Sequence, residues 1–386
     1  MSPPFAPHIV HVYKDYWPPI VGGIERSINW MAHGVKALCP EARITILVNS
    51  RSKETRTRQD GPLEIIEVGE WGRAFSAPLS PAFPLQLRRL KADIWHFHIP
   101  NPTGDLSWLL TRPKGKVVCT YHSDVVRQKW AMAMYGPLLK SFLSRCNRIF
   151  PTSPHLIEAS DYLRPLRNKC VAIPLGMPLE PFERTTEAAL KAREIRRRYK
   201  GYPLVVFVGK LRYYKGLQFL ISAFRALPHV HCLIIGEGPE GEKLQRLSAE
   251  FELTERIHFL GELSDAEMVA HLHAADIFVL PSHLPSEAFG LVQVEAMASG
   301  LPVISCELGT GVSFVNQEGV SGRIIPPADD VAMAQAIEDL LNNPNERNRL
   351  AEGALRRARE LFSRESMAKN LLTQYRSLLE EPQNPG

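Results

Sequence analysis

The stretch that best defines the fold reads Glu287-Ala-Phe-Gly-Leu-Val-Gln-Val-Glu295-Ala-Met-Ala-Ser-Gly300-Leu-Pro302. It joins two apolar runs, 277–280 and 302–305, which we predict to be strands. Its second half predicts a helix that begins at about Leu291 and ends at Gly300. The order of strand, tight loop, helix and strand indicates a parallel sheet whose loops meet at its carboxyl edge.

The same alternation runs through both halves of the chain. In the first half we predict strands at 8–13, 44–48, 63–68, 93–97, 116–120, 148–152 and 169–173, and helices at 24–38, 137–146 and 155–162. In the second half we predict strands at 204–208, 231–235, 257–260, 277–280, 302–305 and 323–325, and helices at 188–199, 217–227, 241–251, 265–275, 291–299, 331–341 and 345–379. The fold class is therefore α/β, with two doubly wound, Rossmann-like domains.

We place the domains at residues 1–182 and 183–365, and expect residues 366–386 to return to the first domain as a helix and tail. A chain of 386 residues exceeds what one hydrophobic core usually supports, and two domains imply a cleft between them. The composition, 45% hydrophobic and 23% charged, is typical of a globular protein, and only 382–386 is predicted to be disordered.

The cysteines and the hydropathy bear on the cellular compartment. Six cysteines occur without a C-x-x-C pair, which is neither a disulfide framework nor a zinc pattern, so we expect them to be reduced and mostly buried. The N-terminus lacks the features of a signal peptide, and no run approaches the ~18 apolar residues that a membrane span requires. We therefore expect a cytoplasmic protein.

Charge is distributed unevenly along the chain. Residues 1–170 carry 23 Lys and Arg against 13 Asp and Glu, whereas residues 171–386 carry 23 against 28. The basic half suggests that the first domain faces something anionic, such as a leaflet of acidic lipid or a phosphorylated acceptor. The alternative is a solvated basic face with no partner.

The loop before residue 291 predicts a site for a diphosphate. Free N–H groups at Gly290, Leu291 and Val292, with the positive end of the helix dipole, favour an anion there. Glu287 can accept from sugar hydroxyls and Glu295 from a ribose. The alternative is that both glutamates only favour the helix start electrostatically.

A second loop, Val208-Gly-Lys-Leu-Arg-Tyr-Tyr-Lys-Gly216, also follows a strand and opens a helix. Its two lysines, Lys210 and Lys215, can flank a diphosphate and offset the charge that grows on a leaving group. Small residues at two further strand ends, at Gly238 and beside Leu260, suit a nucleobase held by main-chain groups. Each of these two loops alone is only a turn.

The first half offers a glycine pair and three histidines. Gly22 and Gly23 let the backbone approach a ligand where the first strand feeds the first helix, although a plain turn is the alternative. The histidines follow strands at His96, His98 and His122. Two of them share a strand face but no third ligand is evident, and no D-x-D motif occurs, so we expect no metal. G-x-G-x-x-G is absent after both first strands, which argues against an NAD enzyme.

Together these motifs resemble the retaining glycosyltransferase family 4, and the resemblance covers nearly the whole chain. The Glu287 to Glu295 spacing is similar to the family's E-x7-E motif, and Gly209 to Gly216 is similar to its G-[RK]-L-x-x-x-K-G loop. Gly22-Gly23 resembles its N-terminal glycine loop. Lys210 stands where the family more often has an arginine, which keeps the charge but loses the bidentate geometry.

The resemblance implies a GT-B fold, retention of anomeric configuration and no cofactor or metal. It implies that Lys210, Lys215, Glu287 and His122 act at the reacting sugar and diphosphate. The implied donor-binding residues are Gly22, Gly23, Lys210, Lys215, Gly238, Leu260, Glu287, Ala288, Phe289, Gly290, Leu291, Val292 and Glu295. The acceptor is expected over the first domain, near His98, Asn101, Asp124, Arg127 and Lys129.

Two stretches, 120–128 and 309–317, resemble members that build bacterial surface polysaccharides from GDP-mannose or GDP-rhamnose. We therefore expect hexosyl transfer to a lipid-linked saccharide, with possible contact to the inner face of the plasma membrane. The alternatives are a UDP-sugar-dependent enzyme with a small acceptor, a nucleotide-sugar epimerase and a non-catalytic binder of the same fold. Basic residues are dispersed and not interleaved with aromatics, so we expect no nucleic acid partner.

Overall fold

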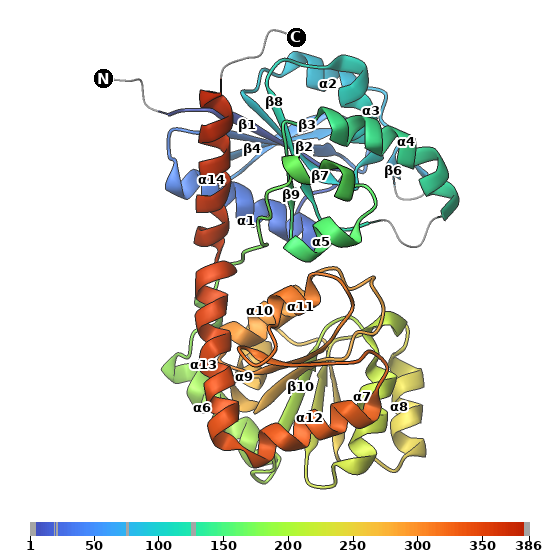
Figure 1. Cartoon of the computed structure of the whole chain (residues 1–386), viewed down its shortest axis with the longest axis vertical. Coiled ribbons are helices and arrows are strands. Elements are labelled where there is room, and N and C mark those ends of the chain that lie inside the picture. The colour runs from blue at the N-terminus through green and yellow to red at the C-terminus, as the bar shows by residue number, and fades with distance from the viewer. Residues whose placement is uncertain (1–4, 19, 21, 75–76, 125–128, 382–386) are drawn as a thin grey trace. The chain divides into compact units, whose positions relative to one another are not determined.

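The computed structural model describes residues 5–18, 20, 22–74, 77–124 and 129–381, and these form two compact units (Figure 1). Unit 1 comprises Met1–Met177 together with Ser363–Gly386, and unit 2 comprises Pro178–Phe362. The chain therefore passes from unit 1 to unit 2 and returns to unit 1 at its end. The disorder predicted for 382–386 lies outside the described residues.

Unit 1 is built on a seven-stranded sheet with the order β3-β4-β2-β1-β7-β8-β9, in which only the β3–β4 pair is antiparallel. Its strands are β1 (His8–Val12), β2 (Arg43–Asn49), β3 (Arg56–Asp60), β4 (Leu63–Val68), β7 (Ile94–Ile99), β8 (Lys116–Tyr121) and β9 (Arg148–Pro151), with a separate hairpin of β5 (Arg73–Ala74) and β6 (Ala77–Pro78). Its helices are α1 (Gly23–Leu38), α2 (Phe83–Arg89), α3 (Pro102–Thr111), α4 (Lys129–Arg145), α5 (Pro154–Ala159) and α14 (Arg364–Glu380). The central strand β7 is buried along its whole length, as expected where helices cover both faces of a parallel sheet.

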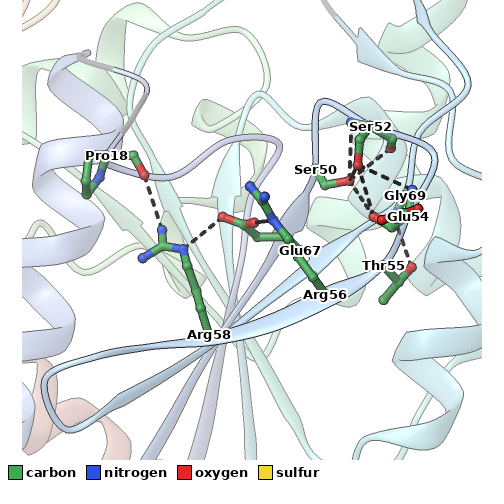
Figure 2. A network of polar contacts seen from close by, with 9 residues as sticks. All are labelled: Pro18, Ser50, Ser52, Glu54, Thr55, Arg56, Arg58, Glu67 and Gly69. Atoms are coloured by element: carbon green, nitrogen blue, oxygen red, sulfur yellow. Dashed lines mark hydrogen bonds and ion pairs between the residues drawn. The ribbon is translucent and has the colours of Figure 1, made fainter.

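The edge strand β3 consists largely of polar residues, and ion pairs attach it to the neighbouring strand β4 (Figure 2). Both Arg56 and Arg58 contact the buried carboxylate of Glu67 on β4, and Arg58 Nη2 also donates to the carbonyl of Pro18 at 3.2 Å. Burial alone would raise the pKa of Glu67, but the two guanidinium groups hold it below its ordinary value. A charged edge of this kind stops the sheet from pairing with another chain.

Unit 2 is built on a six-stranded sheet with the order β12-β11-β10-β13-β14-β15, and every pair is parallel. Its strands are β10 (Leu204–Val208), β11 (His231–Ile235), β12 (Ile257–Gly261), β13 (Ile277–Leu280), β14 (Val303–Cys306) and β15 (Gly322–Ile325). Its helices are α6 (Thr186–Arg198), α7 (Leu217–Ala223), α8 (Gly241–Glu250), α9 (Asp265–Ala274), α10 (Leu291–Ala298), α11 (Val312–Val315), α12 (Asp330–Asn342) and α13 (Pro344–Leu361).

The predicted fold class is confirmed, because both units are doubly wound parallel sheets flanked by helices. The strand predicted at 169–173 is wrong: only Cys170 forms an isolated bridge, to Ile149, and the residues before it form a 3-10 helix. The stretch predicted to be helical at 345–379 is helical but divided into α13 and α14, because Ser363 caps a new helix there with its side chain. The second piece, α14, packs on α1 in unit 1, as predicted for the end of the chain.

Each of the two large sheets has one topological switch point, at which the connections that follow two adjacent strands run to opposite halves of the sheet. In unit 2 it lies between β10 and β13, and in unit 1 between β1 and β7. Ligands of open α/β sheets bind outside the carboxyl ends of the strands at such points. The loops after these four strands are therefore where a site is expected.

Two predictions about the chain's environment can be compared with the structure. All six cysteines are free, and all except Cys170 are buried, as predicted. None of the described helices is both long enough and apolar enough to cross a membrane.

Candidate functional site

The switch point of unit 2 brings the two predicted charged motifs together. Lys215 lies in the 3-10 turn after β10, and Glu287 lies in the loop after β13. Lys215 Nζ donates to Glu287 Oε2 at 2.5 Å. Both residues are buried, with 8% of each exposed, so this is an ion pair inside the protein and not a surface contact.

One oxygen of Glu287 carries the internal bonds. Oε2 accepts from Lys215 and also from Ser282 Oγ at 2.9 Å. Among the described residues Oε1 accepts no hydrogen bond and is not among the unpaired buried atoms. The carboxylate is therefore oriented through one oxygen, which leaves the other to accept from a ligand hydroxyl.

The backbone of the same loop is held by the loop after β14. Thr310 Oγ1 donates to the carbonyl of Glu287 at 2.8 Å, and the N–H of Gly311 donates to the carbonyl of Ala288 at 2.8 Å. Gly290 precedes α10 in the left-handed conformation, with φ of 72°. Because the first N–H groups of a helix lack intrahelical partners, those at the start of α10, four residues after Glu287, favour an anion.

Glycines let the loops of this edge interlock. A Cβ at Gly216, where φ is 70°, would stand 2.0 Å from the carbonyl oxygen of Pro281, and one at Gly236 would stand 2.2 Å from that of Gly209. A Cβ at Gly238 would lie 2.4 Å from the carbonyl oxygen of Leu211. These glycines therefore allow the loops after β10, β11 and β13 to touch backbone to backbone, which sets Lys215 beside Glu287.

The other residues predicted to bind a donor lie along this edge or next to it. Lys210 is exposed, whereas Leu260 on β12 and Leu291, Val292 and Glu295 on α10 are half-buried. Phe289 is buried and packs edge-on against Phe362, with ring centroids 5.9 Å apart. Phe289 therefore supports the loop from beneath, and any contact with a ligand through this residue involves its backbone.

In unit 1 four histidines lie toward one face of the sheet, on the neighbouring strands β1 and β7 and just after β8. His11 pairs in register with His96, and His98 pairs with Thr120, two residues before His122. His11 Nδ1 lies 3.0 Å from His98 Nε2, and His98 Nδ1 lies 3.2 Å from His122 Nε2. The sequence pattern alone does not connect His11 with the other three histidines, because His11 lies within the apolar run of the first strand.

Burial keeps these imidazoles neutral. It lowers the pKa of His11 and of His122 to about 3, and it holds the pKa of His96 and of His98 well below the ordinary value. His11 adds a third nitrogen that the sequence had not revealed, since ring nitrogens of His11, His96 and His98 lie within 4.8 Å of one another, close enough for a metal ion to bridge them. However, His96 uses both ring nitrogens, with Tyr375 OH at 2.5 Å and Thr120 Oγ1 at 2.7 Å. The cluster is thus a hydrogen-bonded layer, and a metal would have to break those bonds.

The remaining residues predicted for unit 1 have different environments. At Gly22 the φ of −142° can be adopted by any residue. A Cβ there would stand 2.1 Å from the carboxylate of Glu25, so this side chain folds back over the start of α1, whose first residue is Gly23. Asn101 is fully buried, and its side chain caps α3. Asp124 is half-buried and accepts from Tyr121 OH and Ser160 Oγ. Arg127 lies outside the described residues. Lys129 begins α4, and its side chain is not among those described.

Comparison with known proteins covers both units. Residues 21–181 match the family model "Glycosyltransferase Family 4", and residues 189–357 match "Glycosyl transferases group 1". The chain is 34% identical to O-antigen chain mannosyltransferase C of Escherichia coli, over 96% of this chain and 99% of that protein. It is 34% identical to D-rhamnosyltransferase WbpZ of Pseudomonas aeruginosa, over 92% of each. Sucrose-phosphate synthase from Thermosynechococcus elongatus shares the fold, with a TM-score of 0.78 and 22% identity over 97% of this chain and 100% of that one.

We expect Gly216→Ala to destabilise unit 2 far more than Gly201→Ala. Both glycines have positive φ, 70° and 77°, so each alanine incurs the left-handed penalty of about 1–2 kcal/mol. Only at Gly216 does the added Cβ meet a carbonyl, because Gly201 has nothing within 4 Å. Thermal unfolding followed by circular dichroism measures the difference, and equal losses would show that the loops do not depend on this close approach.

We expect the free energy of unfolding of unit 1 to fall below pH ~6.5. Unfolded histidines take up protons near that pH, whereas the buried ones resist until about pH 3. Between about pH 6.5 and pH 3 the unfolded state binds more protons than the folded state, so the free energy of unfolding decreases as the pH is lowered, by up to ~1.4 kcal/mol per pH unit for each buried histidine. Above pH ~7.5 the histidines are neutral in both states and do not change the free energy of unfolding. Tryptophan fluorescence during urea unfolding is the measurement, because all six tryptophans lie within residues 17–130.

The matched variant is His11→Gln, which removes one of these groups and should make the slope between pH 6 and pH 4.5 shallower by about one proton. An unfolding free energy that stays constant from pH 7.5 to pH 4.5 would contradict the burial of neutral imidazoles.

Proposed function

Because the chain belongs to glycosyltransferase family 4, we propose that it transfers a hexose of the mannose or rhamnose type from a nucleotide diphosphate sugar, GDP-linked, to a lipid-linked saccharide. The transfer would serve the assembly of a cell-surface polysaccharide. The observation that carries this proposal is the buried Lys215–Glu287 pair at the switch point beside the start of α10. The whole-length similarity to an O-antigen mannosyltransferase and a D-rhamnosyltransferase supports the choice of sugar.

The reaction that we assign to these groups breaks the bond between the anomeric carbon and the phosphate oxygen. Negative charge then grows on the diphosphate, where Lys210, Lys215 and the N-terminal N–H groups of α10 stabilise it. The released phosphate oxygen takes the proton of the acceptor hydroxyl, and the new glycosidic bond forms on the same face of the sugar. This path retains the configuration and requires neither a protein nucleophile nor a metal ion.

Glu287 has two tasks in this proposal. Through Oε2 it holds Lys215 in place before the donor arrives, which limits the reorganisation needed at the moment of reaction. Through Oε1 it accepts from hydroxyls of the transferred sugar, which orients the anomeric carbon. Glu295, one turn into α10, is assigned to the ribose. A covalent glycosyl adduct trapped on Glu287 would contradict this division of roles.

A lipid-linked acceptor requires an approach to the membrane, and unit 1 offers a surface for it. Trp71, Leu79, Leu85, Leu106 and Leu110 are exposed, and Trp71 exposes 75% of its surface. Leu85 lies on α2, and Leu106 and Leu110 lie on α3, which packs against both α2 and β6 (Figure 1). Trp71 and Leu79 flank the β5–β6 hairpin and are joined by a backbone hydrogen bond. Residues 71–116 carry seven Lys and Arg against two Asp and Glu. We call these five side chains and Arg88, Arg89, Arg112 and Lys114 the apolar–basic face, and we assign it to a leaflet of anionic lipid on the cytoplasmic side.

We expect one GDP-sugar to raise the thermal midpoint without added metal, since a ligand that binds only the folded state must stabilise it. Glu287→Gln should weaken donor binding at least tenfold, because the amide carries no charge to pair with Lys215 and has only one oxygen that can accept a hydrogen bond. Glu250→Gln, on the exposed side of α8, is the matched control and should bind as the unchanged protein does. Stabilisation by UDP-sugars alone would contradict the GDP assignment, and no stabilisation by any donor would contradict the function.

We expect the protein to bind vesicles of phosphatidylglycerol and not of phosphatidylcholine, with binding that weakens as NaCl rises from 50 to 300 mM. The double variant Leu106→Ser, Leu110→Ser should lose most of this binding, because both leucines lie on the exposed side of α3. Leu190→Ser changes an equally exposed leucine in unit 2 and is the matched control. Co-sedimentation is the measurement, and binding that ignores salt or responds equally to both variants would contradict the assignment.

A further inference from the structure

Three of the histidines form a chain that crosses the sheet of unit 1 diagonally. Each step moves one strand over and two residues toward the carboxyl edge, from His11 on β1 to His98 on β7 and His122 after β8. The ring nitrogens of successive members lie 3.0 Å and 3.2 Å apart. His11 and His98 are completely buried, whereas His122 keeps 5% of its surface exposed. His122 is therefore the end of the chain that reaches toward the surface.

The ends of the chain are unpaired. His11 Nε2 and His122 Nδ1 are buried nitrogens without a hydrogen-bond partner among the described residues. The middle member, His98, uses both of its nitrogens, Nε2 toward His11 and Nδ1 toward His122. Buried polar atoms normally have a partner, so the unpaired Nδ1 of His122, at the end of the chain nearer the surface, is the position at which a ligand atom would supply the missing bond.

A neutral imidazole has one N–H and one lone pair, and this couples the three rings. If His98 donates from Nδ1, then His122 accepts at Nε2 and must carry its proton on Nδ1, while His11 donates from Nδ1 and presents a bare Nε2. If His98 donates from Nε2, every proton shifts, so that His11 has an unpaired N–H at Nε2 and His122 has a bare Nδ1. The tautomer at one end therefore fixes the tautomer at the other.

The first arrangement is favoured by the surroundings. The second arrangement leaves an N–H without an acceptor at His11, in the completely buried interior of the sheet, and unpaired buried donors are rarer than unpaired acceptors. The first arrangement places the unpaired N–H on His122 Nδ1, which is also buried in the free protein. Of the three residues in the chain, however, His122 is the one with exposed surface, so a ligand oxygen has the shortest way to this N–H.

We propose that His11 and His98 are positioning residues that fix the tautomer of His122, so that its Nδ1–H donates a hydrogen bond to an oxygen of the saccharide substrate. This inference rests on the proposed function only for the identity of that oxygen. The fixed tautomer costs nothing when the substrate binds, because the proton already stands on the nitrogen that faces the ligand.

His96 does not belong to the chain although it stacks on two of its members. Its ring lies 4.8 Å from that of His11 and 4.6 Å from that of His98, but its nitrogens bond to Tyr375 and Thr120. A change at His96 therefore disturbs the same buried layer without breaking the order of donors and acceptors. It provides the control that separates a positioning role from a structural one.

The test is the tautomer of His122 in the free protein, read from the 15N chemical shifts of its ring nitrogens in selectively histidine-labelled protein. We expect Nδ1–H in the unchanged protein and in His96→Leu, and a shift toward Nε2–H in His98→Leu. His98→Asn should restore Nδ1–H, because its amide nitrogen stands close to the place of the histidine Nδ1. With donor and acceptor, kcat/KM should fall at least tenfold in His98→Leu and recover in His98→Asn.

Nε2–H at His122 in the unchanged protein would overturn the proposal without any variant. An unaltered His122 in His98→Leu would overturn it too, provided that tryptophan fluorescence shows unit 1 to be folded. The tautomer is measured without donor or acceptor. If His122 carries Nδ1–H but the protein binds no nucleotide sugar, the proposed function is therefore contradicted while the role of the histidine chain in fixing the tautomer is supported.

Discussion

Carbonyl oxygens stand only 2.0 Å and 2.2 Å from where a Cβ atom would lie at Gly216 and Gly236, and the site of unit 2 depends on this contact between main chains. With no side chains between them, the loops after β10, β11 and β13 become one connected edge. The ion pair of Lys215 and Glu287 is a consequence, since the two residues come from strands that are neighbours only across the switch point. Removing two such charges from water is costly unless geometry and further hydrogen bonds compensate, and Ser282 supplies one of those bonds.

The two units use their switch points differently. In unit 2 charged groups lie at the switch point, namely Lys215 and Glu287, next to the N-terminus of α10. In unit 1 the face beside the point is filled by uncharged imidazoles that stack on one another, with ring centroids about 5 Å apart. Burial suppresses the charge of these rings, so their contribution is directional hydrogen bonding and not electrostatic attraction.

Much of the fold followed from local patterns. The apolar strands β10, β11 and β13 lie where the sequence placed them, because apolar runs in a parallel sheet have clear limits. Strand β3 was missed since its residues, Arg56–Asp60, are polar, and only pairing with β4 and the arginine contacts to Glu67 make it a strand. The break before α14 was missed because a serine cap at residue 363 interrupts a helical pattern that otherwise continues.

For the site, the sequence predicted the residue types and their loops, but the contacts between strands required the register. Glu287 and Lys215 were both identified, yet their direct pairing depends on β13 lying next to β10. His11 illustrates the same limit more sharply. The spacing of His96 and His98 predicts a shared face, whereas the place of His11 beside them follows only from the pairing of β1 with β7. A register prediction between these two strands would have found it.

The return of the chain to unit 1 affects the order in which the protein is completed during synthesis. Ribosomes deliver residues from the N-terminus, so the strands of unit 1 appear first. Their sheet nevertheless lacks α14 until residues 364–380 have been made, and this helix packs on α1 and provides the hydroxyl of Tyr375 that bonds to His96. Unit 2, whose residues are continuous, can close earlier. Unit 1 is therefore begun before unit 2 and completed after it. While unit 2 is being made, His96 in the histidine layer has no Tyr375 to bond with.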